Sequence, residues 1–159
     1  MGIWSTPLGR VIATLFISMV PVLELRGAIP IAVANGMAFL PAMAVSFVGN
    51  LLPVPFIIVF IRRVFALMRR YFPKLGGLVT RLEKRAAAKK EIVLKYEFWG
   101  LFILVAIPLP GTGAWTGALV AAMMDMRLKR AFPAIAMGVA VAAIIVAFVT
   151  YGAGTVFAA

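Results

Sequence analysis

The sequence predicts an all-α integral membrane protein, an inverted repeat of two units that each consist of a re-entrant helical hairpin followed by a full transmembrane helix. Of the 159 residues, 64% are hydrophobic, and the mean hydropathy is +1.08, whereas ordinary soluble domains are about 45–50% apolar. Residues 24–30 (ELRGAIP) and 108–117 (PLPGTGAWTG) break the hydrophobic segments of the two halves in corresponding positions. Two such interruptions are typical of transporters.

The composition also excludes several kinds of chemistry. The chain has no histidine and no cysteine, so disulfides, thiolate nucleophiles, histidine-based metal sites and Ser-His or Cys-His catalysis are not available. Outside the first break, no pair of titratable groups is expected to converge. We therefore expect no enzyme activity, no cofactor and no metal site.

The first repeat is predicted to cover residues 1–61. Residues 27–61 carry no charge, and a continuous helix of that length would measure about 50 Å, well beyond the roughly 30 Å hydrocarbon core. The segment must therefore fold back. We place a re-entrant hairpin at about residues 10–40 and a transmembrane helix at about residues 41–61, which the basic pair that follows ends on the cytoplasmic side.

An alternative arrangement remains for the N-terminal helix. If residues 4–23 span the membrane fully, the N-terminus lies in the cytoplasm. Residues 1–9 lack the basic region of a secretory signal peptide, and no convincing small-residue cleavage site precedes Glu24. We expect this segment to be retained.

Residues 62–95 are predicted to form a basic cytoplasmic linker with an amphipathic helix. Residues 80–83 (TRLE) fit a capping box, and the helix is expected to run to about Tyr96. A thin apolar stripe among lysines and arginines favours a position at the lipid headgroups. The stripe consists of Leu78, Leu82, Ile92 and Tyr96. A solvated linker is the alternative.

The second repeat, residues 96–159, follows the plan of the first. It is predicted to have a hairpin at about residues 96–125 and a transmembrane helix at about residues 132–157. The basic runs lie where the positive-inside rule places cytoplasm, so the net charge of +11 is explained without nucleic acid. Both termini are then outside, and the hairpins enter a prokaryotic inner or plasma membrane from opposite sides.

Residues at the two breaks form the predicted substrate site. Arg26 is expected to precede a short helix with Pro30 near its first turn, and Thr112 is expected to be the N-cap of the corresponding helix in the second half. Helix N-termini and arginine side chains both favour anions such as phosphate or carboxylate. The predicted substrate-binding residues are Arg26, Gly27, Gly111, Thr112 and Gly113. The residues predicted to line a cavity are Asn35, Asn50, Trp115 and Thr116.

Glu24 is predicted to couple transport to protons. It would hold Arg26 while the site is empty and accept a proton when the site is full, because burial disfavours a charged carboxylate. In the alternative interpretation, Glu24 and Arg26 form an ion pair that only fixes the break.

Packing or local structure explains several other residues. Small residues in membrane helices usually serve close packing. We assign only this role to Gly36, Gly49, Gly138 and Gly152. Asn35 could equally form a turn or a cap, and Trp115 could simply pack. Asp125 is expected to form a surface ion pair with Arg127 or Lys129.

On the motifs at residues 24–30 and 108–117, the chain resembles the small multidrug export family, which is similar in layout to the DedA (SNARE-associated, VTT-type) membrane proteins. The resemblance covers nearly the whole chain. It implies two opposed re-entrant hairpins and proton-linked movement of lipids or lipid phosphates across the membrane. The DedA pattern has an arginine in its second half where this chain has Thr112-Gly113-Ala114, so Arg26 would carry the anion site nearly alone.

Three functions are considered. The first is a transporter, flippase or scramblase for a lipid-linked or amphipathic anion. The second is a small multidrug exporter of hydrophobic or cationic compounds, in which Glu24 binds the cation. The third is a membrane scaffold that acts through the basic segment around Lys84 and Lys90. Membrane lipids and a second copy of the chain are the expected partners, the latter because so few short helices enclose little cavity.

Overall fold

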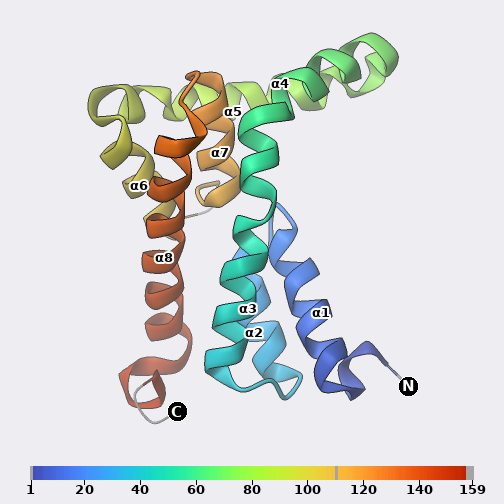
Figure 1. The fold of residues 1–159 in the computed structure, drawn as a ribbon, viewed down its shortest axis with the longest axis vertical. Helices are drawn as coiled ribbons and strands as arrows, with labels where there is room; N and C mark the ends of the chain where they lie inside the picture. The colour runs from blue at the N-terminus through green and yellow to red at the C-terminus, as the bar shows by residue number, and fades with distance from the viewer. Residues whose placement is uncertain (1, 110, 157–159) are drawn as a thin grey trace. The chain divides into compact units, whose positions relative to one another are not determined.

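The computed structural model describes the backbone of residues 2–109 and 111–156, and the side chains of these residues except 90–95, 150 and 153–156. Within these ranges, every regular element is a helix (Figure 1). In chain order the helices are η1 (Ile3–Ser5), α1 (Pro7–Met19), α2 (Glu24–Ala34), α3 (Phe39–Leu51), α4 (Pro53–Tyr71), η2 (Pro73–Leu75), α5 (Gly76–Tyr96), α6 (Phe98–Ala106), α7 (Ala114–Met123) and α8 (Leu128–Val156).

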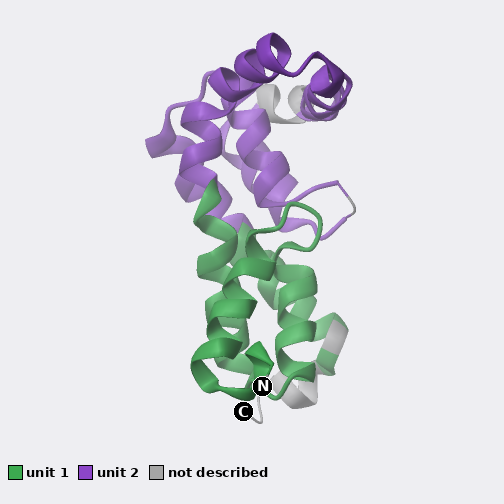
Figure 2. Ribbon diagram, turned by 90° about the vertical axis from the view of Figure 1, so that its right-hand side faces the viewer, with its two compact units in different colours: residues 1–53, 139–159 green, residues 54–138 purple. Residues whose placement is uncertain are grey.

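The chain divides into two compact units (Figure 2). Unit 1 consists of Met1–Pro53 and Val139–Ala159, and unit 2 of Val54–Gly138. The short helices α1 and α2 belong to unit 1, and the short helices α6 and α7 belong to unit 2.

In unit 1, helices α1, α2 and α3 pack against one another. Pro7 opens α1, and the Thr6 hydroxyl oxygen accepts a hydrogen bond from the Gly9 N–H at 3.1 Å, so α1 begins with a regular N-cap. Part of the core consists of Ala32, Met37 and Ala42. These residues, two of them alanines, let the α2 and α3 backbones approach closely, as is usual for helices in membranes.

In unit 2, helix α5 packs against α6 and α7, and these two helices contact each other. The buried side chains include Leu101 and Val105 of α6, Val120 of α7 and Ile135 of α8. A Cβ atom built on Gly138 would lie 2.7 Å from the Val105 Cβ, so the predicted packing role of this glycine is confirmed.

Among the described residues, two stretches are long and apolar enough to cross a membrane, Phe39–Tyr71 and Leu128–Val149. Along the chain, a pair of short helices precedes each of them, in the order expected from the sequence. Helix α4, however, continues through Arg62 to Tyr71, beyond the predicted end at residue 61. Arginine is a good helix former, and the basic pair therefore does not interrupt the helix.

Helix α5 ends at Tyr96 as predicted, but its predicted capping box is wrong. The helix begins at Gly76, and the Thr80 hydroxyl donates a hydrogen bond to the Gly76 carbonyl oxygen at 2.9 Å, so Thr80 is no N-cap. Of the described α5 side chains, Val79 and Ala86 are buried, whereas Leu78 and Tyr96 of the predicted stripe are exposed. The position of the stripe at the lipid headgroups stays a prediction. Ile92 lies outside the described side chains. Helix α5 packs against α6 and α7, and the sequence of α5 alone does not show which of its residues these contacts bury.

Candidate functional site

Glu24 begins helix α2 and is almost completely buried, with 4% of its surface exposed. Its φ of +47° lies in the left-handed region, which costs a non-glycine residue roughly 1–2 kcal/mol. Such strain persists only where the surrounding structure imposes it, and it occurs often at functional sites. A carboxylate in the first turn also interacts favourably with the positive end of the helix dipole.

Arg26 lies inside α2, and the prediction that it precedes the helix is wrong. The turn continues across this position because the Gly27 N–H donates to the Leu23 carbonyl oxygen at 2.9 Å. Pro30 is therefore an interior residue of α2 and not a first-turn proline. Because proline has no N–H, the carbonyl oxygen of Arg26 loses its usual helical donor.

The second break contains a loop that is held by Thr112. Its hydroxyl lies 2.6 Å from the Ile107 carbonyl oxygen and 2.7 Å from that of Leu109, and it accepts from the Leu109 N–H at 3.2 Å. The N-cap of α7 is Gly113, with no side-chain cap. The predicted N-cap role of Thr112 is wrong, because its side chain bonds to its own loop.

The glycines of this loop have a conformational role. Gly111 has a φ of +81° and Gly113 a φ of +118°, and both values lie in the region that favours glycine. Of the other predicted residues in this half, Trp115 and Thr116 are half-buried on the first turn of α7.

Asn35 caps helix α2, because its Nδ2 donates to the Ile31 carbonyl oxygen at 2.8 Å. Of the two roles considered, cap or cavity lining, the structure supports the cap. Gly36 follows with a φ of +82°, so it serves the turn in addition to any packing role.

Arg10 is not among the predicted site residues, yet its side chain makes two hydrogen bonds to the backbone. Its Nη1 donates to the Gly36 carbonyl oxygen at 2.5 Å, and its Nε donates to the Trp4 carbonyl oxygen at 2.9 Å. The side chain therefore ties the N-terminal segment to the turn between α2 and α3. Arg10 is the only basic residue before Arg26, and this isolation in an apolar segment was the available signal.

The buried polar side chains that the structure describes all lie in unit 1. They are Thr14, Ser18, Glu24, Ser46 and Asn50. The Ser18 hydroxyl donates to the Leu15 carbonyl oxygen at 2.8 Å. The Ser46 Oγ and both polar atoms of the Asn50 amide have no hydrogen-bond partner among the described residues. Asn50 is thus buried as expected of a site residue, whereas Thr14, Ser18 and Ser46 were not predicted.

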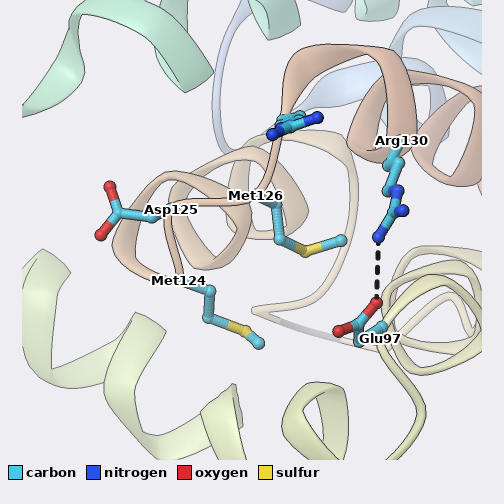
Figure 3. Close-up of a pocket in the computed structure, with 6 residues that line it drawn as sticks. Glu97, Met124, Asp125, Met126 and Arg130 are labelled. Atoms are coloured by element: carbon cyan, nitrogen blue, oxygen red, sulfur yellow. Dashed lines mark ion pairs between the residues drawn. The ribbon is translucent and has the colours of Figure 1, made fainter.

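Unit 2 contains a cavity of about 440 Å³ next to the start of α8 (Figure 3). It is lined by Glu97, Met124, Asp125, Met126, Arg127 and Arg130. Arg130 Nη1 lies 3.7 Å from Glu97 Oε2, and both side chains are exposed. An exposed ion pair at this distance contributes little stability.

Asp125 pairs with Arg62, not with Arg127 or Lys129 as predicted. The Arg62 Nη2 and Asp125 Oδ1 atoms are 2.6 Å apart. The hydrogen bond from Arg62 lowers the pKa of the Asp125 carboxyl, and the charge of Arg62 acts in the same direction. Asp125 has a φ of +56°, so the turn before α8 directs its side chain toward α4 instead of along its own segment.

A family model described as "Putative small multi-drug export protein" matches residues 24–145. The match begins at Glu24 and includes both breaks, and it covers more than half of the chain. The chain belongs to this small multi-drug export family. Its two long apolar helices agree with the membrane location that export requires. No curated protein and no solved structure matches the chain, and the likeness in layout to DedA proteins stays a prediction.

Proposed function

We propose that the chain exports small hydrophobic or cationic amphipathic compounds across a membrane and that the carboxylate of Glu24 binds them. The burial of Glu24 supports this proposal. Ionisable groups at membrane depth are costly and usually mark a substrate or proton site. The other described acidic side chains are not buried: Glu83 lies on α5, Glu97 between α5 and α6, and Asp125 between α7 and α8, and each pairs with an arginine.

The geometry at the first break favours a cation over an anion. Glu24 places a negative charge at the N-terminus of α2, where an anionic substrate would have to bind. Two nearby amides are already used, since the N–H groups of Glu24 and Gly27 donate to Val20 and Leu23. A carboxylate attracts a cationic compound more strongly in an apolar setting than in water. Arg26 interacts electrostatically with Glu24, so a cationic compound would compete with this guanidinium for the carboxylate.

The proposal includes two re-entrant hairpins, α1 with α2 and α6 with α7, related as inverted repeats. Helix α1 has 13 residues and α7 has 10, so each is about 15–20 Å long, short of the roughly 30 Å needed to cross the hydrocarbon core. Inverted repeats of broken helices place the substrate site near the bilayer midplane. The basic segment 62–95 is then cytoplasmic, and a second copy of the chain completes the enclosure.

A second candidate function is transport of a lipid-linked anion, which the position of Arg26 favours. Arg26 is half-buried in the first turn of α2, and an arginine fork binds phosphate well. Helix α7 begins without a side-chain cap, and helix N-termini favour anions. At the second break, a Cβ atom on Gly111 would have no neighbour within 4 Å, so an anionic group could approach the backbone there.

Export of a cationic dye from cells or from proteoliposomes tests the two candidates. Glu24→Gln should abolish export of ethidium, and Arg26→Gln should retain it. Glu83→Gln is the matched control, because Glu83 is an acidic residue that pairs with Arg69 away from the breaks. Undiminished dye export by folded Glu24→Gln protein would refute the proposal. Loss of lipid phosphate transport in Arg26→Gln, without any dye export by the wild type, would establish the second candidate.

Single-cysteine labelling tests the orientation, because the chain has no native cysteine. A cysteine in place of Lys84 should react with a membrane-impermeant maleimide only after the membrane is opened. A cysteine in place of Thr6 should react in intact cells. The reverse pattern would contradict the cytoplasmic placement of the basic segment.

A further inference from the structure

We propose that Ser46 and Asn50 form part of a binding site for a monovalent alkali cation at the C-terminal end of helix α3. Ser46 is 0% exposed and Asn50 is 1% exposed. The Ser46 Oγ, the Asn50 Oδ1 and the Asn50 Nδ2 have no hydrogen-bond partner among the described residues. Buried polar groups are almost always hydrogen-bonded, and the penalty for an unsatisfied group is largest in a membrane. A ligand bound to these side chains would remove this penalty.

The two side chains share one face of α3. Positions four residues apart lie above one another on a helix. Gly49 lies on the same face, and a Cβ atom built on it would be 2.0 Å from the Ser18 Oγ and 2.7 Å from the Leu15 carbonyl oxygen. This face of α3 therefore lies against the last turn of α1. The Ser18 hydroxyl donates to Leu15, so its oxygen keeps lone pairs for a cation.

The backbone adds further oxygen ligands at the same end of α3. Pro53 and Pro55 have no N–H, so the carbonyl oxygens of Gly49 and Leu51 lose the donors that a continuous helix would supply. The C-terminus of a helix also carries a partial negative charge. Free carbonyls and helix C-termini at a break are the groups that coordinate coupling ions in transporters with discontinuous helices.

The chemistry of these groups selects the ligand. Hydroxyl, amide and carbonyl oxygens are hard, neutral ligands, whereas calcium and magnesium are usually bound through carboxylates. Neutral oxygens therefore suit a monovalent ion. Glu24, buried on α2, supplies negative charge within the same packed helices, and Arg26 opposes it. A water molecule of the ion's shell accepts from the Asn50 Nδ2, which cannot bind a cation itself.

Thermal unfolding of the purified chain tests this site without any transport assay. Sodium chloride should raise the melting temperature of the wild type above its value in choline chloride at equal ionic strength. Asn50→Leu should lose the sodium effect, and Ser46→Ala should weaken it. Asn50→Asp keeps an oxygen ligand and adds a negative charge, so the sodium concentration for half of the effect should fall about tenfold.

Asn35→Ala is the matched control, because the Asn35 amide already bonds to Ile31. This variant should be less stable than the wild type and keep the full sodium effect. Equal stabilisation of the wild type by sodium and choline salts would overturn the proposal, as would a sodium effect that survives Asn50→Leu. If Asn50→Leu does not fold, an unchanged sodium affinity in Asn50→Asp overturns it equally.

The use of this ion to drive export rests on the proposed function, whereas its binding does not. A sodium effect that depends on Asn50, in a chain that exports no dye, would support the ion site and refute the export proposal. If dye export depends on Glu24 but sodium does not stabilise the chain, the export proposal is supported and the ion site is refuted.

Discussion

Gly49→Ala should destabilise the chain strongly for a substitution of one hydrogen by a methyl group. The new Cβ would lie 2.0 Å from the Ser18 Oγ and 2.7 Å from the Leu15 carbonyl oxygen, whereas ordinary contact begins at 3.4 Å. The Ser18 hydroxyl can rotate away, but it then loses its hydrogen bond to Leu15, at a cost of about 1 kcal/mol. The Leu15 oxygen belongs to the backbone of α1 and can recede only if the helices separate.

The expected loss of stability combines overpacking, the lost hydrogen bond and the change in helix propensity. Overpacking of a tight contact costs about 1–3 kcal/mol, and a rigid backbone oxygen at 2.7 Å places Gly49 at the upper end of that range. Alanine is better than glycine inside a helix by about 1 kcal/mol, which offsets the lost hydrogen bond. The net decrease in the free energy of unfolding is therefore about 2–3 kcal/mol.

Unfolding by denaturing detergent, followed by the helical circular dichroism signal, measures this difference. Gly77→Ala is the matched control, because a Cβ atom on Gly77 would have no neighbour within 4 Å. The control should lose no stability, because alanine is a better helix former than glycine and the added methyl group meets no neighbour. If Gly49→Ala is as stable as Gly77→Ala, the close contact between α1 and α3 is refuted, and with it the placement of Ser46 and Asn50 against α1.

Three further predictions concern other parts of the chain. Gly113→Ala should cost about 1–2 kcal/mol, because its φ of +118° is unfavourable for any side chain; a melting temperature equal to that of the wild type would show that the loop adopts another conformation. Arg10→Met should cost about 1–3 kcal/mol through loss of two charged hydrogen bonds, whereas Arg81→Met on the exposed face of α5 should not change unfolding. Arg62→Gln should raise the pKa of the Asp125 carboxyl toward 3.8, as followed by carboxyl NMR. Since the folded pKa is lowered, the stabilisation from this pair is present near neutral pH and disappears as the pH falls through the lowered pKa.

The breaks in the chain could be predicted from sequence because their causes are local. Proline and glycine act through their own φ angles and missing N–H groups. Residues 108–113 therefore end α6 at Ala106, close to the predicted position. Pro30, by contrast, lies inside α2 and does not end the helix. A proline excludes only one helical donor, so the upstream turn can still form when the residues before it supply other bonds.

The partners of charged and hydroxyl side chains could not be predicted because they depend on tertiary structure. Asp125 has two basic neighbours in sequence, yet it pairs with Arg62. The Thr112 hydroxyl bonds backward to its loop and not forward to α7. Each of these side chains has several possible partners nearby in the sequence. Which partner it bonds to depends on the local backbone conformation, such as the φ angle of Asp125. A positive φ at Asp125 is not encoded by any pattern that periodicity detects.

The buried polar residues could not be recognised as a site from the sequence, for a different reason. Serine is common as a small packing residue in membrane helices, so Ser46 carries no distinct signal in the sequence. Its significance arises because Asn50 lies one turn further on the same face and Gly49 brings both against α1. Neither side chain finds a hydrogen-bond partner there among the described residues. A helix that merely packed would gain stability by replacing Asn50 with leucine of similar volume. If Asn50→Leu instead loses both sodium response and export while remaining folded, the polar groups are retained for the ligand and not for the fold.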